Sequence, residues 1–135
     1  MRKIISITIF VIVALFCSTT AFADVNTRAV GSAKRSCILS LSGSSATCTS
    51  TYTDTSGVTA KVVITQTLEK HSFLWIWNTV GGAWTKTSYN GNVSFTNKAS
   101  NLESGTYRVK TVFDVTSSDG ATESITLYST EKTVG

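Results

Sequence analysis

Apolar and polar residues alternate along most of this chain, and this pattern constrains the fold more than any other feature. In the segment TAKVVITQTLEK, residues 59–70, four of the five apolar residues lie at even positions: Ala60, Val62, Ile64 and Leu68. A period of two places them on one face of a β-strand, whereas no window of the sequence has a convincing helical period. The chain is therefore predicted to be all-β.

The abundance of serine and threonine favours the same fold class. Together they make up 37 of the 112 residues from Asp24 to Gly135. Mucin-like stalks have a similar composition, but they are rich in proline and this chain contains none. Threonine suits the solvated face of a sheet because its branched side chain fits the pleat while its hydroxyl contacts water.

Turn signals divide the alternating segments into about seven or eight short strands. These signals are DTSG at residues 54–57, Asn90–Gly91 and SSDG at residues 117–120. Strands of this number and spacing are typical of a two-sheet antiparallel sandwich, and we predict an immunoglobulin-like one. The segment SFLWIWNTV, residues 72–80, is apolar on both faces and is predicted to be one strand.

The stretch NLESGTYRVKTVF, residues 101–113, predicts the connection between the two sheets. Leu102, Gly105 and Tyr107 have the spacing of a tyrosine corner, in which the tyrosine hydroxyl bonds to the backbone a few residues upstream. Gly105 supplies the backbone freedom that the bend needs. In antibody domains a cysteine follows this tyrosine by two residues, but Val109 occupies that position here, so no disulfide is expected between the sheets.

Two cysteines, Cys37 and Cys48, flank the first predicted hairpin. If Ser42–Gly43 is a two-residue turn, Leu41 lies opposite Ser44 and Cys37 lies directly opposite Cys48. This register predicts a disulfide that closes a loop of about a dozen residues and contributes roughly 3 kcal/mol. The alternative is two separate thiols.

The N-terminus has the pattern of an export signal. Arg2 and Lys3 form a positive region, residues 4–17 are apolar, and small residues precede Asp24, where cleavage is expected. A lipoprotein signal at Cys17 is the alternative. We expect a secreted, extracellular protein without a stable membrane anchor after cleavage, and with a signal-peptide helix only in the precursor.

The predicted organisation is a signal peptide at residues 1–23, an N-terminal extension at residues 24–35 and a single β-sandwich domain at residues 36–135. Loss of Arg2 and Lys3 lowers the formal charge from +4 to +2, with ten basic and eight acidic residues remaining. The remaining cations do not form a clustered stripe, so nucleic acid is not an expected partner.

Three segments together carry a resemblance to a known group. They are the cysteine-flanked hairpin, SGTYRVKT at residues 104–111 and ESITLYS at residues 123–129. With the central tryptophan-bearing segment, they resemble a family of small secreted β-sandwich proteins of Gram-positive, Firmicutes-type bacteria. The resemblance spans about residues 37–129. It implies a secreted sandwich and brings no activity or ligand with it.

Catalytic patterns are absent from the sequence. His71 is the single histidine, no H-E-x-x-H spacing is present, and no G-x-S-x-G motif precedes a serine. The carboxylates show no pairing typical of a glycosidase, and Asp54 and Asp119 occupy turn positions. Asp114 and Glu123 are expected to pair with Arg108 and Lys110 at the surface. We expect no enzyme, no cofactor and no metal, although loop carboxylates leave calcium as an alternative.

The aromatic residues are the one positive signal for binding. Trp75 and Trp77 share one face of the predicted strand with Phe73, and Trp84 follows after two glycines. On a solvent-facing sheet this row is a platform on which sugar rings or other apolar faces stack. The alternative, which we favour, is that the row fills the core, with Leu74 and Ile76 outside and Trp84 as the tryptophan that is exposed.

These observations favour a secreted, non-catalytic protein that binds a cell-surface glycan or protein. The alternative is a small toxin-like or antimicrobial effector, suggested by the size, the mild positive charge and the aromatic strands. The sequence leaves the oligomeric state open.

Overall fold

The structure is a computed structural model that describes residues 33–135. The predicted signal peptide and its helix lie outside the described residues, as do residues 24–32. The described residues form nine strands and no helix. The strands are β1 (Ala33–Ser42), β2 (Ser45–Asp54), β3 (Thr59–Phe73), β4 (Ile76–Thr79), β5 (Trp84–Ser88), β6 (Asn92–Ala99), β7 (Gly105–Ser117), β8 (Thr122–Tyr128) and β9 (Lys132–Val134).

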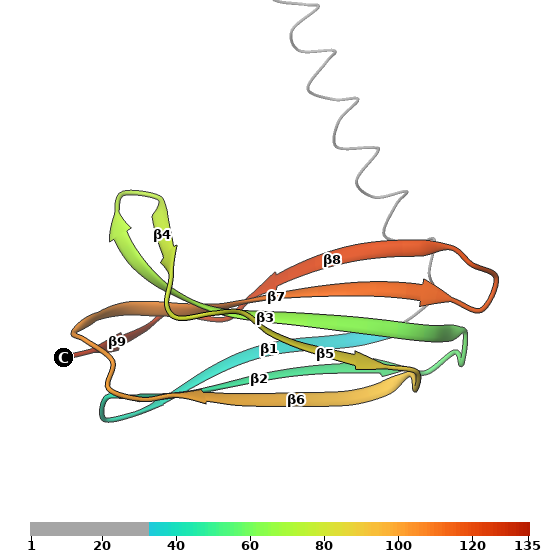
Figure 1. The fold of residues 1–135 in the computed structure, drawn as a ribbon, viewed down its shortest axis with the longest axis horizontal. Helices are drawn as coiled ribbons and strands as arrows, with labels where there is room; N and C mark the ends of the chain where they lie inside the picture. Colours follow the sequence, from blue (N-terminus) through green and yellow to red (C-terminus); the bar gives the residue numbers. More distant parts are fainter. Residues whose placement is uncertain (1–32) are drawn as a thin grey trace, which may run out of the picture.

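The strands form two antiparallel sheets that lie face to face (Figure 1). One sheet has the order β1-β2-β6. In the other, β3 and β7 pair along most of their length; β4 and β5 pair with the free side of β3, and β8 and β9 with the free side of β7. The hairpin of β3 and β4 rises out of this second sheet, away from the first (Figure 1). The all-β prediction is confirmed.

The alternation of the sequence becomes the alternation of burial. In β3 the even residues from Val62 to Leu68 are buried while their odd neighbours are partly exposed. The core contains two apolar clusters, one around Leu68 and Val109 and the other around Ile64 and Phe113. Each fully buried side chain of this size contributes about 1.5–3 kcal/mol.

The register of the first hairpin differs from the prediction. The turn residues are Gly43 and Ser44, so Ser42 pairs with Ser45 and Cys37 pairs with Ser50 rather than Cys48. Gly43 has φ of +59° and Ser44 does not have a positive φ, which is the type II′ pattern with glycine at the first central position. The expected Ser42–Gly43 turn would instead place serine there.

The predicted direct pairing of the cysteines is therefore wrong. Cys37 and Cys48 still face the core, because the register shift is two residues, but they are diagonal neighbours. Such neighbours lie about 7–8 Å apart, a separation that a disulfide spans only if the backbone moves. Both cysteines are free in the structure, and the Cys37 sulfur lies 3.1 Å from the Thr111 hydroxyl oxygen.

We expect both thiols to be protected by the fold. Burial raises the pKa of Cys37, and burial together with the nearby Cys37 raises the pKa of Cys48 to about 11. Because the thiolate is the nucleophile, N-ethylmaleimide should label Cys48 slowly in the folded chain. After unfolding, mass spectrometry should find both cysteines labelled without prior reduction. If the unfolded chain were labelled only after reduction, the two cysteines would form a disulfide after all.

Asp54 organises the turn between β2 and β3. Its carboxylate accepts hydrogen bonds from the Ser56 hydroxyl at 2.6 Å, the Ser56 amide at 2.8 Å and the Thr59 amide at 2.8 Å. These bonds, the Ser56 hydroxyl first, hold the pKa of Asp54 well below its ordinary value of 3.8. The ionised form is therefore favoured in the folded state.

This turn predicts a loss of stability in acid. Because the pKa is lower in the folded chain, the contribution of Asp54 is complete above about pH 4 and disappears as the pH falls further. We expect Asp54→Asn to lower the free energy of unfolding by about 1–2 kcal/mol at pH 7 and by less near pH 2. Urea unfolding at both pH values measures this. An equal loss of stability at both pH values would show that the ionised form of Asp54 does not stabilise the turn.

The predicted corner residues lie where the chain passes from β6 in one sheet to β7 in the other. The Tyr107 hydroxyl donates a hydrogen bond to the Glu103 carbonyl oxygen at 2.6 Å, and the Leu102 amide donates to the Ser44 carbonyl oxygen at 2.9 Å. Tyr107 and Leu102 are both buried. A Cβ on Gly105 would lie 2.6 Å from the Lys70 Cε atom, so the glycine allows this close approach.

The predicted strand at residues 72–80 is the largest error in the sequence reading. β3 continues through Phe73, the chain reverses at Leu74 and Trp75, and β4 returns from Ile76. Neither Leu74 nor Trp75 is a usual turn residue, which is why the alternation alone favoured one uninterrupted strand. β1 also begins at Ala33, so residues 33–35 belong to the sheet rather than to the expected N-terminal extension.

Candidate functional site

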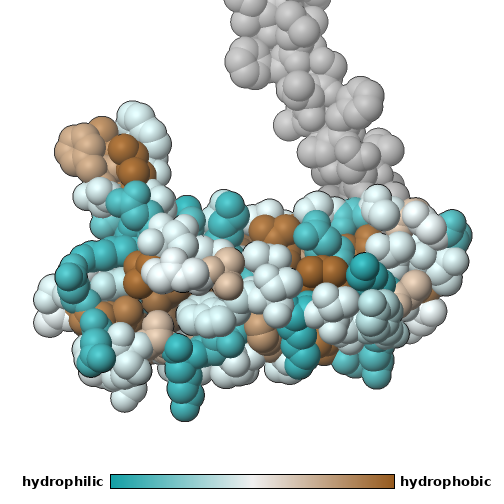
Figure 2. Space-filling model, viewed as in Figure 1, coloured by the Kyte–Doolittle hydropathy of each residue, from teal (hydrophilic) through white to brown (hydrophobic). Residues whose placement is uncertain are grey.

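The β3–β4 hairpin ends in four consecutive large apolar side chains, which we call the apolar tip. The exposed fractions are 65% for Phe73, 60% for Leu74, 81% for Trp75 and 46% for Ile76. In Figure 2, brown and tan surface lies beside paler surface on the part that stands away from the body of the molecule. Other exposed large apolar residues of the described chain, such as Ile38 and Tyr89, lie elsewhere in the sequence.

The backbone of the apolar tip is strained in a way that its residue types do not favour. Leu74 has φ of +51°, the left-handed region that glycine, asparagine and aspartate enter most readily. A bulky residue there costs on the order of 1–3 kcal/mol. A register shift between His71 and Phe73 lies immediately before it. An apolar residue is therefore present at a position where a polar turn residue would give a more stable hairpin.

His71 fixes the tip from within the hairpin. Its Nε2 atom hydrogen-bonds the carbonyl oxygen of Leu74, and its ring lies 5.1 Å from the Trp77 ring, centroid to centroid. His71 also pairs with Trp77 across the two strands. The single histidine of the chain thus has a structural partner at the tip, and the carbonyl group of the strained residue is satisfied.

Arg108 supports the hairpin from the outer face of the sheet. Its guanidinium carbon lies 4.1 Å from the centroid of the Trp77 ring and 4.2 Å from that of the Tyr128 ring. Its Nε atom also donates to Glu69 at 2.8 Å. A cation between two rings and beside a carboxylate holds the base of the hairpin to β7 and β8.

On the other side of the hairpin base lies an open cavity of about 780 Å³. Its walls come from β3, β4 and the corner segment at residues 100–105, and most of its lining residues are polar. Lys70 lies between the two walls: its Nζ atom is 3.2 Å from Glu103 Oε2 and 6.0 Å from the Tyr107 ring centroid. This ion pair ties the hairpin to the corner.

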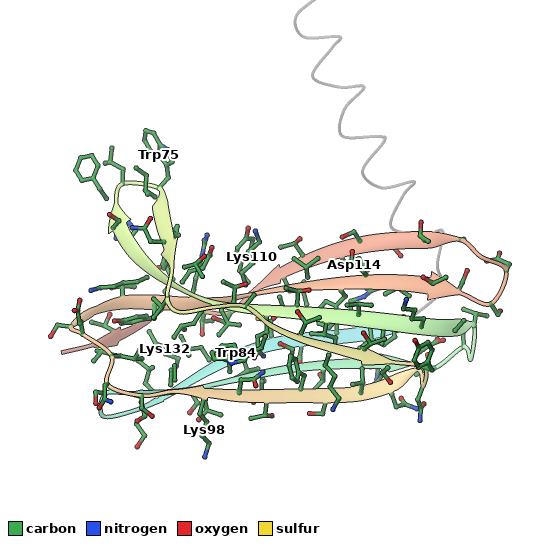
Figure 3. All side chains as sticks on the ribbon, viewed as in Figure 1. Trp75, Trp84, Lys98, Lys110, Asp114 and Lys132 are labelled. Atoms are coloured by element: carbon green, nitrogen blue, oxygen red, sulfur yellow. The ribbon has the colours of Figure 1, made fainter. Side chains whose placement is uncertain are left out.

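The three tryptophans do not form a common platform. Trp75 is at the apolar tip, Trp77 is half-buried against Arg108, and Trp84 in β5 packs against the core. Figure 3 shows Trp75 at the end of the projecting hairpin and Trp84 within the sandwich. The favoured core position of Phe73, Trp75 and Trp77 is wrong, because the chain reverses at the tip and Trp77 lies against Arg108. The expectation that Trp84 is the exposed tryptophan is also wrong.

The carboxylates that could act in catalysis lie in separate parts of the structure described for residues 33–135. Asp54 and Asp119 bind backbone amides in turns, and Glu69 and Glu103 pair with Arg108 and Lys70. The expected pairing of Asp114 and Glu123 with Arg108 and Lys110 is therefore replaced, for Arg108, by Glu69. Within residues 33–135 no cluster of three or more histidine, cysteine or carboxylate side chains has the geometry of a metal site.

Comparison with family models, with curated proteins and with solved structures finds no match to this chain. Between Ala33 and Gly135, no helix is long and apolar enough to cross a membrane. The candidate site therefore depends on its geometry alone.

Sequence reasoning missed the apolar tip as a unit. The signal was available: the alternating segment at residues 59–70 is followed, after His71 and Ser72, by five consecutive apolar residues, Phe73 to Trp77, without a polar face. Such a run fits either a covered strand or an exposed contact surface. The deciding feature, the left-handed Leu74, is not encoded by a turn motif.

Proposed function

We propose that this protein is a secreted, non-catalytic binding protein that contacts its target outside the cell through the apolar tip. The observation that carries the proposal is the exposure of four consecutive large apolar side chains, 46–81%, at the end of a projecting hairpin. Contiguous exposed apolar surface of this kind marks interaction sites in soluble proteins.

The stability of the fold gives no reason for these residues. Fully burying each side chain would contribute about 1.5–3 kcal/mol, and exposure forgoes much of that. Leu74 adds strain that a glycine or asparagine would relieve. Local rules that a sequence breaks without a stability gain are expected at functional sites. Binding to a target would explain why these residues are present.

Export is part of the proposal. The basic, apolar and small-residue regions at residues 1–23 support a signal peptide, with cleavage before Asp24. The two stacked antiparallel sheets and the Tyr107 hydrogen bond to Glu103 support an immunoglobulin-like sandwich. In such domains, loops at the ends of the strands commonly carry the binding surface. Here the β3–β4 hairpin takes that role.

An apolar target fits the tip better than a glycan does. A sugar site combines an aromatic ring with polar side chains that bind hydroxyl groups. Trp75 has apolar neighbours on both sides at the tip, Leu74 and Ile76. The target is therefore an apolar surface at the cell exterior.

Retention on cells tests this function. The exported chain, residues 24–135, carries a fluorescent label and is incubated with intact Gram-positive bacteria. A tip variant carries Phe73→Thr, Leu74→Asn, Trp75→Gly and Ile76→Thr, because Asn-Gly is the preferred two-residue hairpin turn and threonine suits strands. We expect the wild-type chain to be retained and the tip variant to be washed off. Equal retention, or none for either chain, would contradict the proposal.

A membrane-active effector is the second candidate, and the same apolar tip favours it. The two functions differ in their consequence: an effector releases the contents of vesicles or stops growth, whereas a binding protein leaves the membrane intact. Dye release from vesicles by micromolar exported chain, abolished in the tip variant, would favour the effector. Binding without release would favour the binding protein.

A further inference from the structure

We propose that the target of the apolar tip is the surface of an anionic lipid bilayer, into whose interface the tip inserts. This inference rests on the proposed function and names the class of its target. It follows from the shape of the tip, its side chains, its backbone and the charges around it.

The shape of the tip suits a bilayer. The apolar cap is convex and stands away from the body of the molecule (Figure 2). A protein partner would need a matching pocket, whereas the headgroup region of a bilayer accepts a protrusion without one. Each arm of the hairpin contributes two apolar residues, about 7 Å at the rise of a β-strand. This length matches the depth of about 5–10 Å to which interfacial segments insert.

The side chains also match the interface. Phe73, Leu74 and Ile76 are purely apolar, and Trp75 has an apolar body with one N–H donor. Tryptophan is enriched at the boundary between headgroups and acyl chains for this reason. Trp75 is also the most exposed member of the tip, at 81%.

Backbone groups of the tip make hydrogen bonds that lower the cost of transferring the tip out of water. Unsatisfied peptide groups cost several kcal/mol in an apolar medium. Phe73 pairs with Ile76 across the hairpin, and the carbonyl oxygen of Leu74 accepts a hydrogen bond at His71 Nε2. The histidine thus satisfies the one tip carbonyl whose residue is in a left-handed conformation.

The charges around the tip favour an anionic surface. From Lys70 to Thr79 the hairpin contains one lysine, which pairs with Glu103, one histidine and no carboxylate. Glu69 is neutralised by Arg108. Lys110 lies two residues further along β7, and Figure 3 shows it on the side of the sheet from which the hairpin rises. Each lysine near a bilayer rich in anionic lipid contributes roughly 1 kcal/mol.

Co-sedimentation with vesicles tests the inference. The probes are large unilamellar vesicles of phosphatidylcholine alone and of phosphatidylcholine mixed with phosphatidylglycerol. We expect the exported chain to sediment with the mixed vesicles, and the tip variant to bind about 100-fold or more weakly. Brominated lipid should quench the fluorescence of Trp75 in the bound chain.

Two lysine variants form a matched pair. Lys110→Gln should weaken binding to the mixed vesicles about fivefold, with no change for neutral ones. Lys98→Gln, on the outer side of the other sheet (Figure 3), should bind as the wild type does. Equal effects of the two substitutions would overturn the role of charge.

Three results would overturn the inference. They are failure of the wild-type chain to bind vesicles, equal binding of the tip variant, and a tip-dependent dimer in light scattering without vesicle binding, which would make a second copy of the chain the occupant. Tip-dependent retention on cells together with any of these would leave the proposed function intact and point to a protein target.

Discussion

Replacing Arg108 by alanine is expected to lower the free energy of unfolding by about 2–4 kcal/mol at neutral pH. The substitution leaves the Glu69 side chain, which is only 12% exposed, without its cation. Removing one partner of a buried pair typically costs about 3–5 kcal/mol, and the partial exposure of Arg108 reduces this. The contacts with Trp77 and Tyr128 are lost as well. Urea unfolding measures the change.

Arg108→Lys is the matched control for this prediction. It keeps the positive charge but has no planar guanidinium to lie between the two rings. We expect Arg108→Lys to lower the free energy of unfolding by about half as much as Arg108→Ala does. Acrylamide quenching of Trp77 should increase in Arg108→Ala, because the ring loses its cover. A loss below about 0.5 kcal/mol in Arg108→Ala, the range of ordinary surface substitutions, would contradict the supporting role of Arg108.

The second large effect is expected at Gln66, which belongs to a network of polar side chains between the two sheets. Gln66 is fully buried; its Nε2 atom donates to the Ser50 hydroxyl oxygen at 2.8 Å and its Oε1 atom accepts from Asn97 at 2.9 Å. Ser50 in turn lies 2.8 Å from Thr111 Oγ1. We expect Gln66→Ala to cost about 3–4 kcal/mol, because it leaves both a cavity and unpaired polar groups.

Volume and hydrogen bonding can be separated at this position. Gln66→Leu fills most of the space but removes the amide, so a loss of about 2 kcal/mol is expected from the unpaired partners. Thr67→Ala, on the outer face of the same strand, should change stability by less than about 0.5 kcal/mol. If Gln66→Leu left the free energy of unfolding unchanged, the network of polar side chains would not contribute to stability.

The parts of the fold that depend on periodicity were predictable. The even residues of β3 were assigned to one face from the sequence. Val62, Ile64 and Leu68 are buried, whereas Ala60, at a register shift, is exposed. A short motif, the tyrosine-corner spacing of Leu102, Gly105 and Tyr107, placed the bend before Tyr107. Both features depend on residues close together in the chain.

The register of the cysteine hairpin was not predictable from alternation. A turn at Ser42–Gly43 and a turn at Gly43–Ser44 place the same residues on the core face, so the hydrophobic pattern does not distinguish them. The backbone conformation of Gly43 distinguishes them. The predicted turn at Ser42–Gly43 placed the two cysteines opposite each other, but this agreement was a coincidence of the wrong register.

The apolar tip was unpredictable for the opposite reason. Turns are recognised by glycine, proline, asparagine, aspartate and serine. The reversal at Leu74 and Trp75 contains none of these. It is defined instead by a local contact of His71 with Leu74 and by a long-range contact of Arg108 with Trp77. The contact of Arg108 with Trp77 links residues 31 positions apart, which no local pattern reveals.

The central claim is that Trp75 is exposed in the free protein and covered in the bound one. Three exported chains, each keeping one tryptophan and carrying phenylalanine at the other two positions, allow acrylamide quenching to be measured for each ring. We predict that Trp75 is quenched most strongly in buffer and becomes protected with phosphatidylglycerol-containing vesicles, while Trp84 changes little. Strong protection of Trp75 in dilute buffer would return this ring to the core and contradict the account.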